Sequence, residues 1–225
     1  MELKTILFDF DGTIADTLPA AFDAFRYVFK KYDGKEMTDE DIVQYFGPIE
    51  DEMLRKHLEH KDKLNQAIED FYEQYEKGHD REFEGLEKIQ EMLEQFKEMD
   101  LNLGIVTGKS RRSLTFSLEA LGIYDYFDVT IAGDDVKNPK PDKEGVEKCM
   151  KLLQNKPSEV LFVGDSESDM AAGAAAGVKT AAAQWFSTVQ TSEFKTEPDY
   201  TFTSISDFCQ YIEGHQQAKK EKKIH

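Results

Sequence analysis

Six short apolar runs alternate with helical patterns along most of this chain. The runs cover residues 5–8, 102–106, 129–132, 159–163, 180–183 and 200–202, and the helical patterns cover 86–99, 110–121, 142–153 and 167–176. Strands that alternate with helices favour a parallel sheet with helices on both faces. The sequence therefore predicts an α/β fold built on a Rossmann-like, doubly wound parallel sheet.

One stretch, residues 18–78, interrupts this alternation. It has no strand-like run, and its apolar residues recur at helical spacing. Thr38 and Asp41 resemble a capping box that opens a short helix ending near Phe46, and Gly47-Pro48 marks a turn. We therefore expect residues 17–82 to form an all-helical domain, inserted into an α/β core domain made of residues 1–16 and 83–225.

Charge and composition exclude several classes of partner. The chain has 225 residues and a formal net charge of -17, which disfavours binding to nucleic acid and to anionic membranes. Cys149 and Cys209 are predicted to be reduced thiols, and no signal peptide or spanning segment is visible, so we expect a cytoplasmic protein. We also expect a monomer or weak homodimer, and a frayed Lys-rich tail over residues 218–225.

Two carboxylates, Asp9 and Asp11, directly follow the first apolar run. Residues two apart in an extended chain point the same way, so both can face one site. A carboxylate can attack phosphorus to form an aspartyl phosphate, and a second group must then protonate the leaving oxygen and activate water. Asp9 is the candidate nucleophile and Asp11 the candidate acid/base. The alternative is an acidic pair in an ordinary turn at Gly12.

Two further polar segments come later in the chain. Thr107, Gly108 and Lys109 follow the second apolar run, where a hydroxyl and free amides at a helix start suit a phosphate oxygen; the alternative is a simple helix cap by Ser110. Lys140 lies between two prolines, so its ammonium can be aimed at a nucleophile and a transferring phosphoryl group. The alternative for Lys140 is a solvated loop lysine.

An acidic segment, residues 164–169, follows the fourth apolar run. Carboxylate oxygens suit Mg²⁺, which uses one or two carboxylates together with phosphate oxygens and water. Asp165 is the stronger candidate ligand, and Asp169 is either a second ligand or a partner of Lys140. A helix N-cap is an alternative that can coexist with the metal role. All these segments lie at carboxyl ends of predicted strands, where ligands of parallel sheets bind.

Together these motifs resemble the haloacid dehalogenase superfamily, in particular its phosphoglycolate phosphatase and beta-phosphoglucomutase-like group. The resemblance implies an α/β core with a mobile helical cap, Mg²⁺ as cofactor and a small phosphorylated metabolite as substrate. It implies a catalytic set of Asp9, Asp11, Thr107 and Lys140, and a metal set of Asp9, Asp11, Asp165 and Asp169, with Asp11 contributing its backbone carbonyl. The expected substrate-binding residues are Phe10, Asp11, Thr107, Gly108, Lys109, Lys140, Gly47 and Glu50.

The resemblance also sorts the possible reactions. Halide-removing members lack the acid that corresponds to Asp11, so we do not expect dehalogenation. Phosphonate-cleaving members use a Schiff-base lysine from the cap, and no cap lysine of this chain matches their motif. Glu50 stands about where mutases carry an Arg for the second phosphate of their substrate, and an acid there would repel that phosphate unless it points to solvent. We therefore expect a phosphatase for a mono-phosphorylated, phosphoglycolate- or sugar-phosphate-like metabolite. The alternatives are an inorganic pyrophosphatase, a sugar-phosphate mutase and an inactive binding module.

Overall fold

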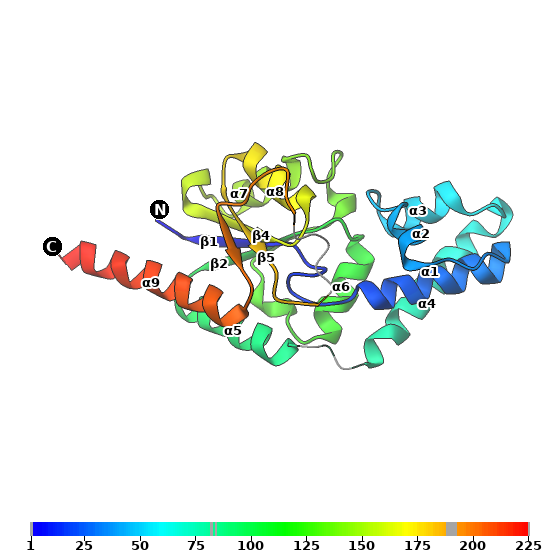
Figure 1. Ribbon diagram of the computed structural model, residues 1–225, viewed down its shortest axis with the longest axis horizontal. Helices are drawn as coiled ribbons and strands as arrows, with labels where there is room; N and C mark the ends of the chain where they lie inside the picture. The colour runs from blue at the N-terminus through cyan, green and yellow to red at the C-terminus, as the bar shows by residue number, and fades with distance from the viewer. Residues whose placement is uncertain (1, 82, 84, 188–192, 225) are drawn as a thin grey trace.

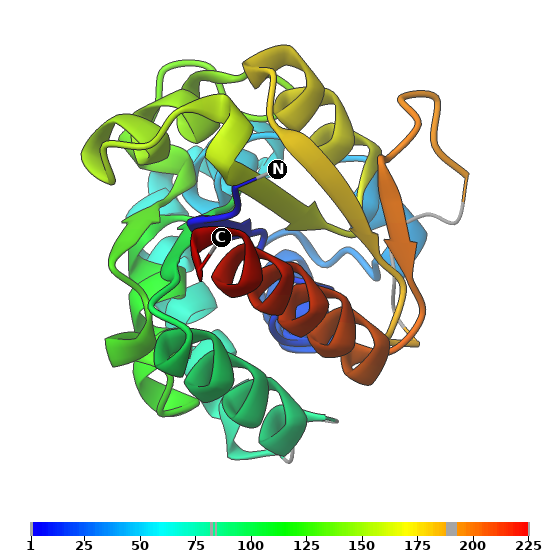
Figure 2. The same cartoon turned by 90° about the vertical axis from the view of Figure 1, so that its left-hand side faces the viewer.

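A six-stranded parallel sheet forms the centre of the α/β core. The computed structural model describes residues 2–81, 83, 85–187 and 193–224. The strand order is β3-β2-β1-β4-β5-β6, and Figures 1 and 2 show the sheet from two directions. Each strand coincides with one of the apolar runs, so the predicted sheet is confirmed: β1 (Thr5–Phe8), β2 (Asn102–Val106), β3 (Val129–Ile131), β4 (Val160–Gly164), β5 (Lys179–Ala183) and β6 (Tyr200–Phe202).

Helices cover both faces of this sheet (Figure 1). Alternation along β1 explains the two layers: Ile6 and Phe8 join the apolar cluster of one face, and Leu7 joins the cluster of the other. The first face carries α5 (Leu86–Glu98), α6 (Arg111–Ala120) and α9 (Ile205–Ile224), and the second carries α7 (Glu144–Leu152) and α8 (Glu167–Ala176). Short 3-10 turns occur at Lys61–Lys63, Gly78–Asp80, Tyr124–Tyr126, Gly133–Asp135 and Pro157–Glu159.

The chain between β1 and α5 forms a group of helices with an apolar core of its own. It contains α1 (Leu18–Asp33), α2 (Asp39–Val43), α3 (Glu50–His57) and α4 (Leu64–Lys77), which lie beside the sheet at the right of Figure 1. Phe25, Phe29 and Phe71 are buried among these helices. The capping box of Thr38 and Asp41 is present at the start of α2, although this helix already ends at Val43. The exact domain boundaries stay a prediction.

The expectation of a frayed tail at the Lys-rich end of the chain was wrong, because α9 continues to Ile224. The helix is anchored by Phe208 and Ile212, which are buried against the sheet, and Gln216 donates a hydrogen bond to the Leu3 carbonyl at 3.1 Å. Lys and Glu are good helix formers, so the helix can extend past its anchored part. Among the described residues, none of the helices is long and apolar enough to cross a membrane.

Candidate active site

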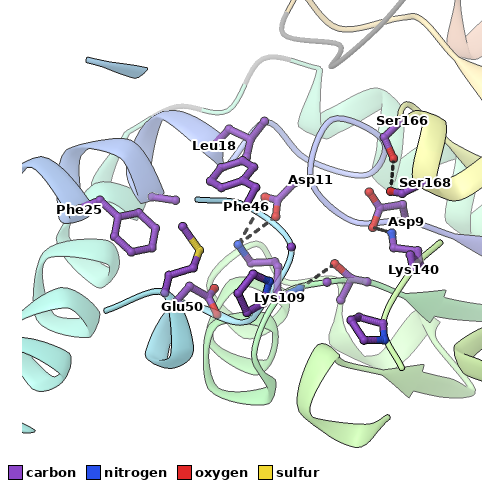
Figure 3. A pocket seen from close by; sticks show the side chains of 17 residues that line it. Asp9, Asp11, Leu18, Phe25, Phe46, Glu50, Lys109, Lys140, Ser166 and Ser168 are labelled. Atoms are coloured by element: carbon purple, nitrogen blue, oxygen red, sulfur yellow. Dashed lines mark hydrogen bonds and ion pairs between the residues drawn. The ribbon is translucent and has the colours of Figure 1, made fainter. Parts of the chain in front are cut away.

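The loops after three adjacent strands meet at one edge of the sheet. Phe8 at the end of β1 pairs in register with Ile105 of β2 and Val163 of β4, so the segments that follow these strands are neighbours. They line a cavity of about 170 Å³ between the sheet and the cap, the group of helices α1–α4 (Figure 3). The lining includes the following predicted site residues: Asp9, Asp11, Gly47, Glu50, Thr107, Gly108, Lys109 and Lys140.

Three buried carboxylates gather beside this cavity. Asp9, Asp165 and Asp169 each place a ligand oxygen within 4.8 Å of the others, and all three residues are buried. Carboxylate oxygens in such a cluster are the hard ligands that Mg²⁺ prefers, so the donor set fits the metal that the sequence predicted. The side chain of Asp11 lies outside this cluster.

Lys140 bridges two of the clustered acids. Its Nζ lies 2.7 Å from Asp9 Oδ1 and 2.6 Å from Asp169 Oδ1, as Figure 3 shows for Asp9. Burial lowers the pKa of Lys140, but the two carboxylates outweigh it and raise that pKa above its ordinary value. Burial together with Asp169 raises the pKa of Asp9 to about 7, although Lys140 acts in the opposite direction. The second oxygen of Asp169 accepts from the Ser166 amide at 3.0 Å, so Asp169 both holds Lys140 and caps α8.

Two glycines allow the acidic segments to approach one another. Gly12 has a φ of +78°, and a Cβ at this position would lie 2.3 Å from Asp165 Oδ2. A Cβ on Gly164 would lie 2.4 Å from Asp169 Cγ. Both distances are shorter than real Cβ contacts, so the cluster requires residues without a side chain here. The sequence indicated the turn at Gly12 but not the close contact with Asp165.

A second buried ion pair joins Asp11 and Lys109. Lys109 Nζ lies 3.1 Å from Asp11 Oδ2 with both side chains nearly buried, and the Thr17 hydroxyl also donates to Asp11. The same ammonium lies 4.7 Å from the centre of the Tyr75 ring of α4. Burial lowers the pKa of Lys109, but the interactions with Asp11, Tyr75 and Glu50 together outweigh it, so the net shift is upward. The carboxylate of Asp11 therefore has a fixed cationic partner, which spacing along the sequence could not reveal.

The predicted phosphate-binding residues after β2 lie at the cavity wall. Thr107 is buried and its Oγ1 accepts from the Lys109 amide at 3.3 Å, so it shapes a turn beside Gly108. Phe10 differs from the rest of the predicted set because its side chain is fully buried in the α/β core. Any contact of Phe10 with a ligand is therefore left to its backbone.

A family model described as haloacid dehalogenase-like hydrolase matches residues 6–183. The chain belongs to this family. The resemblance inferred from the motifs is thereby confirmed, and the chain is a hydrolase of the phosphatase type.

Individual relatives agree with this family over nearly the whole chain. The pyrophosphatase PpaX of Bacillus cereus strain B4264 is 32% identical over 207 residues, covering 92% of this chain and 95% of that protein. A predicted phosphoglycolate phosphatase from Haemophilus somnus 129pt has a similar structure, with a TM-score of 0.81, 20% identity and coverage of 94% and 99%. A candidate beta-phosphoglucomutase from Thermotoga maritima has a TM-score of 0.72 at 26% identity, with the same coverage.

In this haloacid dehalogenase-like hydrolase the cap supplies an apolar wall opposite the acids. Its side chains come from α1, from the turn around Gly47 and from α3, and Figure 3 shows several of them facing the cavity. They are Leu18, Ala21, Phe25, Phe46, Pro48 and Met53. The sequence did not single out this wall, because the spacing of its apolar residues is also that of an ordinary helical core.

The cap also contacts the core through one face of α6. Ser110, Ser113 and Ser117 are buried on this face, which we call the serine face. Tyr72 and Tyr75 of α4 place their hydroxyls 2.9 Å from Ser110 Oγ and 2.7 Å from Ser117 Oγ. Further contacts come from His79, whose Nε2 lies 3.0 Å from Ser117 Oγ, and from Glu50, which contacts both Ser110 and Ser113.

Proposed function

We propose that this hydrolase is a Mg²⁺-dependent phosphatase that releases phosphate from a small mono-phosphorylated metabolite through an aspartyl phosphate on Asp9. One observation carries the proposal. Asp9 lines the cavity, and Lys140 and two further buried carboxylates surround it. A nucleophilic carboxylate needs such a positioned cation to approach an anionic phosphoryl group.

In the first step, an oxygen of Asp9 attacks phosphorus while the ester P–O bond breaks. Lys140 already bonds Asp9 Oδ1, which leaves Oδ2 to form the new bond. Asp11 acts here in its protonated form and donates that proton to the departing oxygen, so the leaving group departs as an alcohol. In the second step, water attacks the phosphorus of the aspartyl phosphate, Asp11 accepts the proton, and Asp9 is released as a carboxylate together with phosphate.

The other residues orient the phosphoryl group and balance its charge. Thr107 and the amide of Gly108 line the wall where phosphoryl oxygens would be held. Asp9, Asp165 and Asp169 would hold the Mg²⁺ ion, which neutralises negative charge on the phosphoryl oxygens when bound. The apolar wall of the cap excludes water from the reacting group, which strengthens these electrostatic interactions.

A pyrophosphatase is the second candidate, and the PpaX relatives favour it. The exposed lysines of the cap do not: Lys56, Lys61 and Lys63 are all on its outer surface. They are not among the residues that line the cavity. Pyrophosphate retains more negative charge than a monoester, and these lysines offer it no compensation inside the site.

The experiment measures phosphate release from an aryl phosphate and from pyrophosphate. Asp9→Asn should abolish release from both, whereas Asp125→Asn, which changes an exposed aspartate, should leave it unchanged. EDTA should stop the wild-type reaction and Mg²⁺ should restore it. An Asp9→Asn protein with wild-type turnover would remove the nucleophile from the mechanism, and faster hydrolysis of pyrophosphate than of the aryl phosphate would favour the second candidate.

A further inference from the structure

Glu50 is a buried acid with two partners across the boundary between cap and core. It is the first residue of α3, and it is only 7% exposed. Its Oε2 accepts from the Ser110 amide at 2.9 Å, and its Oε1 accepts from the Ser113 hydroxyl at 2.7 Å. The side chain therefore does not point to solvent. Figure 3 shows it at the cap side of the cavity, beside Lys109.

The position that Glu50 occupies would otherwise attract an anion. Ser110 is the N-cap of α6, and helix N-termini carry unpaired amides and a partial positive charge. This N-terminus comes three residues after Thr107, so it adjoins the loop where phosphoryl oxygens would be held. The Glu50 carboxylate fills it with a negative charge that belongs to the protein.

Neighbouring contacts keep Glu50 in this position. The Tyr72 hydroxyl lies 2.9 Å from Ser110 Oγ and 2.6 Å from Asp51 Oδ1, so it ties the start of α3 to the serine face of α6. If the Glu50 carboxylate left this N-terminus, Ser110 and Ser113 would lose their acceptor. The acid would then lie against the apolar wall, which is unfavourable.

The remaining charges of the cavity offer little to a second anionic group. Lys109 and Lys140 are the cations among its described lining residues. Each is already paired, Lys140 with Asp9 and Asp169, and Lys109 with Asp11. The cap side of the cavity is otherwise apolar, so a leaving group would meet hydrocarbon and the Glu50 carboxylate.

We propose, resting on the function proposed above, that Glu50 is a specificity-determining residue. It limits the site to phosphate monoesters with an uncharged, partly apolar leaving group, and it excludes substrates that carry a second anionic group next to the reacting phosphate. Glu50 achieves this by occupying the helix terminus that the second anion would need and by repelling that anion.

The test compares the binding of inorganic phosphate and pyrophosphate by calorimetry in the presence of Mg²⁺. The host is Asp9→Asn, so that no probe is consumed. Adding Glu50→Gln removes the charge but keeps an acceptor for Ser110 and a donor towards Ser113. It should raise the affinity for pyrophosphate relative to phosphate by about tenfold or more. Glu52→Gln removes an equal charge from an exposed position of the same helix and should change this ratio less than about twofold.

Two results would overturn the role of Glu50: an unchanged ratio with Glu50→Gln, or an equal change with Glu52→Gln. If Glu50→Gln did not fold, as judged by circular dichroism, the test is the binding of two probes to the Asp9→Asn host alone. It should bind phenyl phosphate more tightly than pyrophosphate, and the reverse order would overturn the proposal. Phosphate release by the wild type is measured in parallel. Its absence would refute the phosphatase function, whereas the binding ratio would still decide the role of Glu50.

Discussion

Lys140→Met should destabilise this protein strongly in the absence of divalent metal. The ammonium of Lys140 is only 9% exposed and lies within 2.7 Å of Asp9 and Asp169, whose side chains are 5% and 0% exposed. Removing one partner of a buried pair leaves uncompensated charge, which costs about 3–5 kcal/mol. For a chain of this size the melting temperature should fall by about 6–20 °C.

The assay is urea and thermal unfolding in EDTA, followed by circular dichroism. Lys143→Met is the matched control, because Lys143 forms a 2.7 Å pair with Glu147 in which both side chains are 49% exposed. This control should lose less than about 1 kcal/mol. Added Mg²⁺ should recover part of the loss in Lys140→Met, since a divalent cation restores positive charge among the acids. A Lys140→Met protein that unfolds within about 1 kcal/mol of wild type in EDTA would refute the reasoning.

Two further predictions concern the contact between cap and core. Tyr75→Phe removes a 2.7 Å bond between fully buried hydroxyls and should cost about 1–3 kcal/mol in urea unfolding; no loss relative to the exposed control Tyr27→Phe would contradict it. Burial lowers the pKa of His79 below its ordinary 6.5, despite its bond to the Tyr75 carbonyl. The neutral ring is therefore the stabilising form, and its contribution is present above pH 6.5 and lost as pH falls through the folded pKa. His79→Gln should unfold with less difference between pH 7.5 and pH 5 than wild type, and equal differences would exclude His79 as the cause.

The sheet and the positions of the acidic segments were predictable for a physical reason. A strand buried on both faces leaves an uninterrupted apolar run, and parallel strands bring the residues that follow them to one edge. Asp9, Thr107 and Asp165 each follow such a run. The pattern of apolar runs was therefore enough to predict that residues as many as about 150 positions apart lie at the same edge of the sheet.

The remaining features depend on contacts that no local pattern records. The partners of Glu50 lie 60 and 63 positions away on another helix, and the 3.1 Å pair of Lys109 with Asp11 joins two separate loops. The extension of α9 was missed because its last residues are mostly Lys and Glu and show no apolar periodicity. The contacts of Glu50 and Lys109 are decided by tertiary packing, whereas the end of α9 follows the helix propensity of Lys and Glu.

The serine face gives α6 two attachments at once. Its first turn adjoins the segment around Thr107, and its length receives the hydroxyls of Tyr72 and Tyr75. Movement of the cap away from the core would therefore act on the same helix that adjoins the proposed phosphate-binding segment, so product release and cap opening would be coupled. The turnover number at saturating substrate would then depend on the hydroxyl contacts of Tyr72 and Tyr75 as well as on the rate of bond breaking.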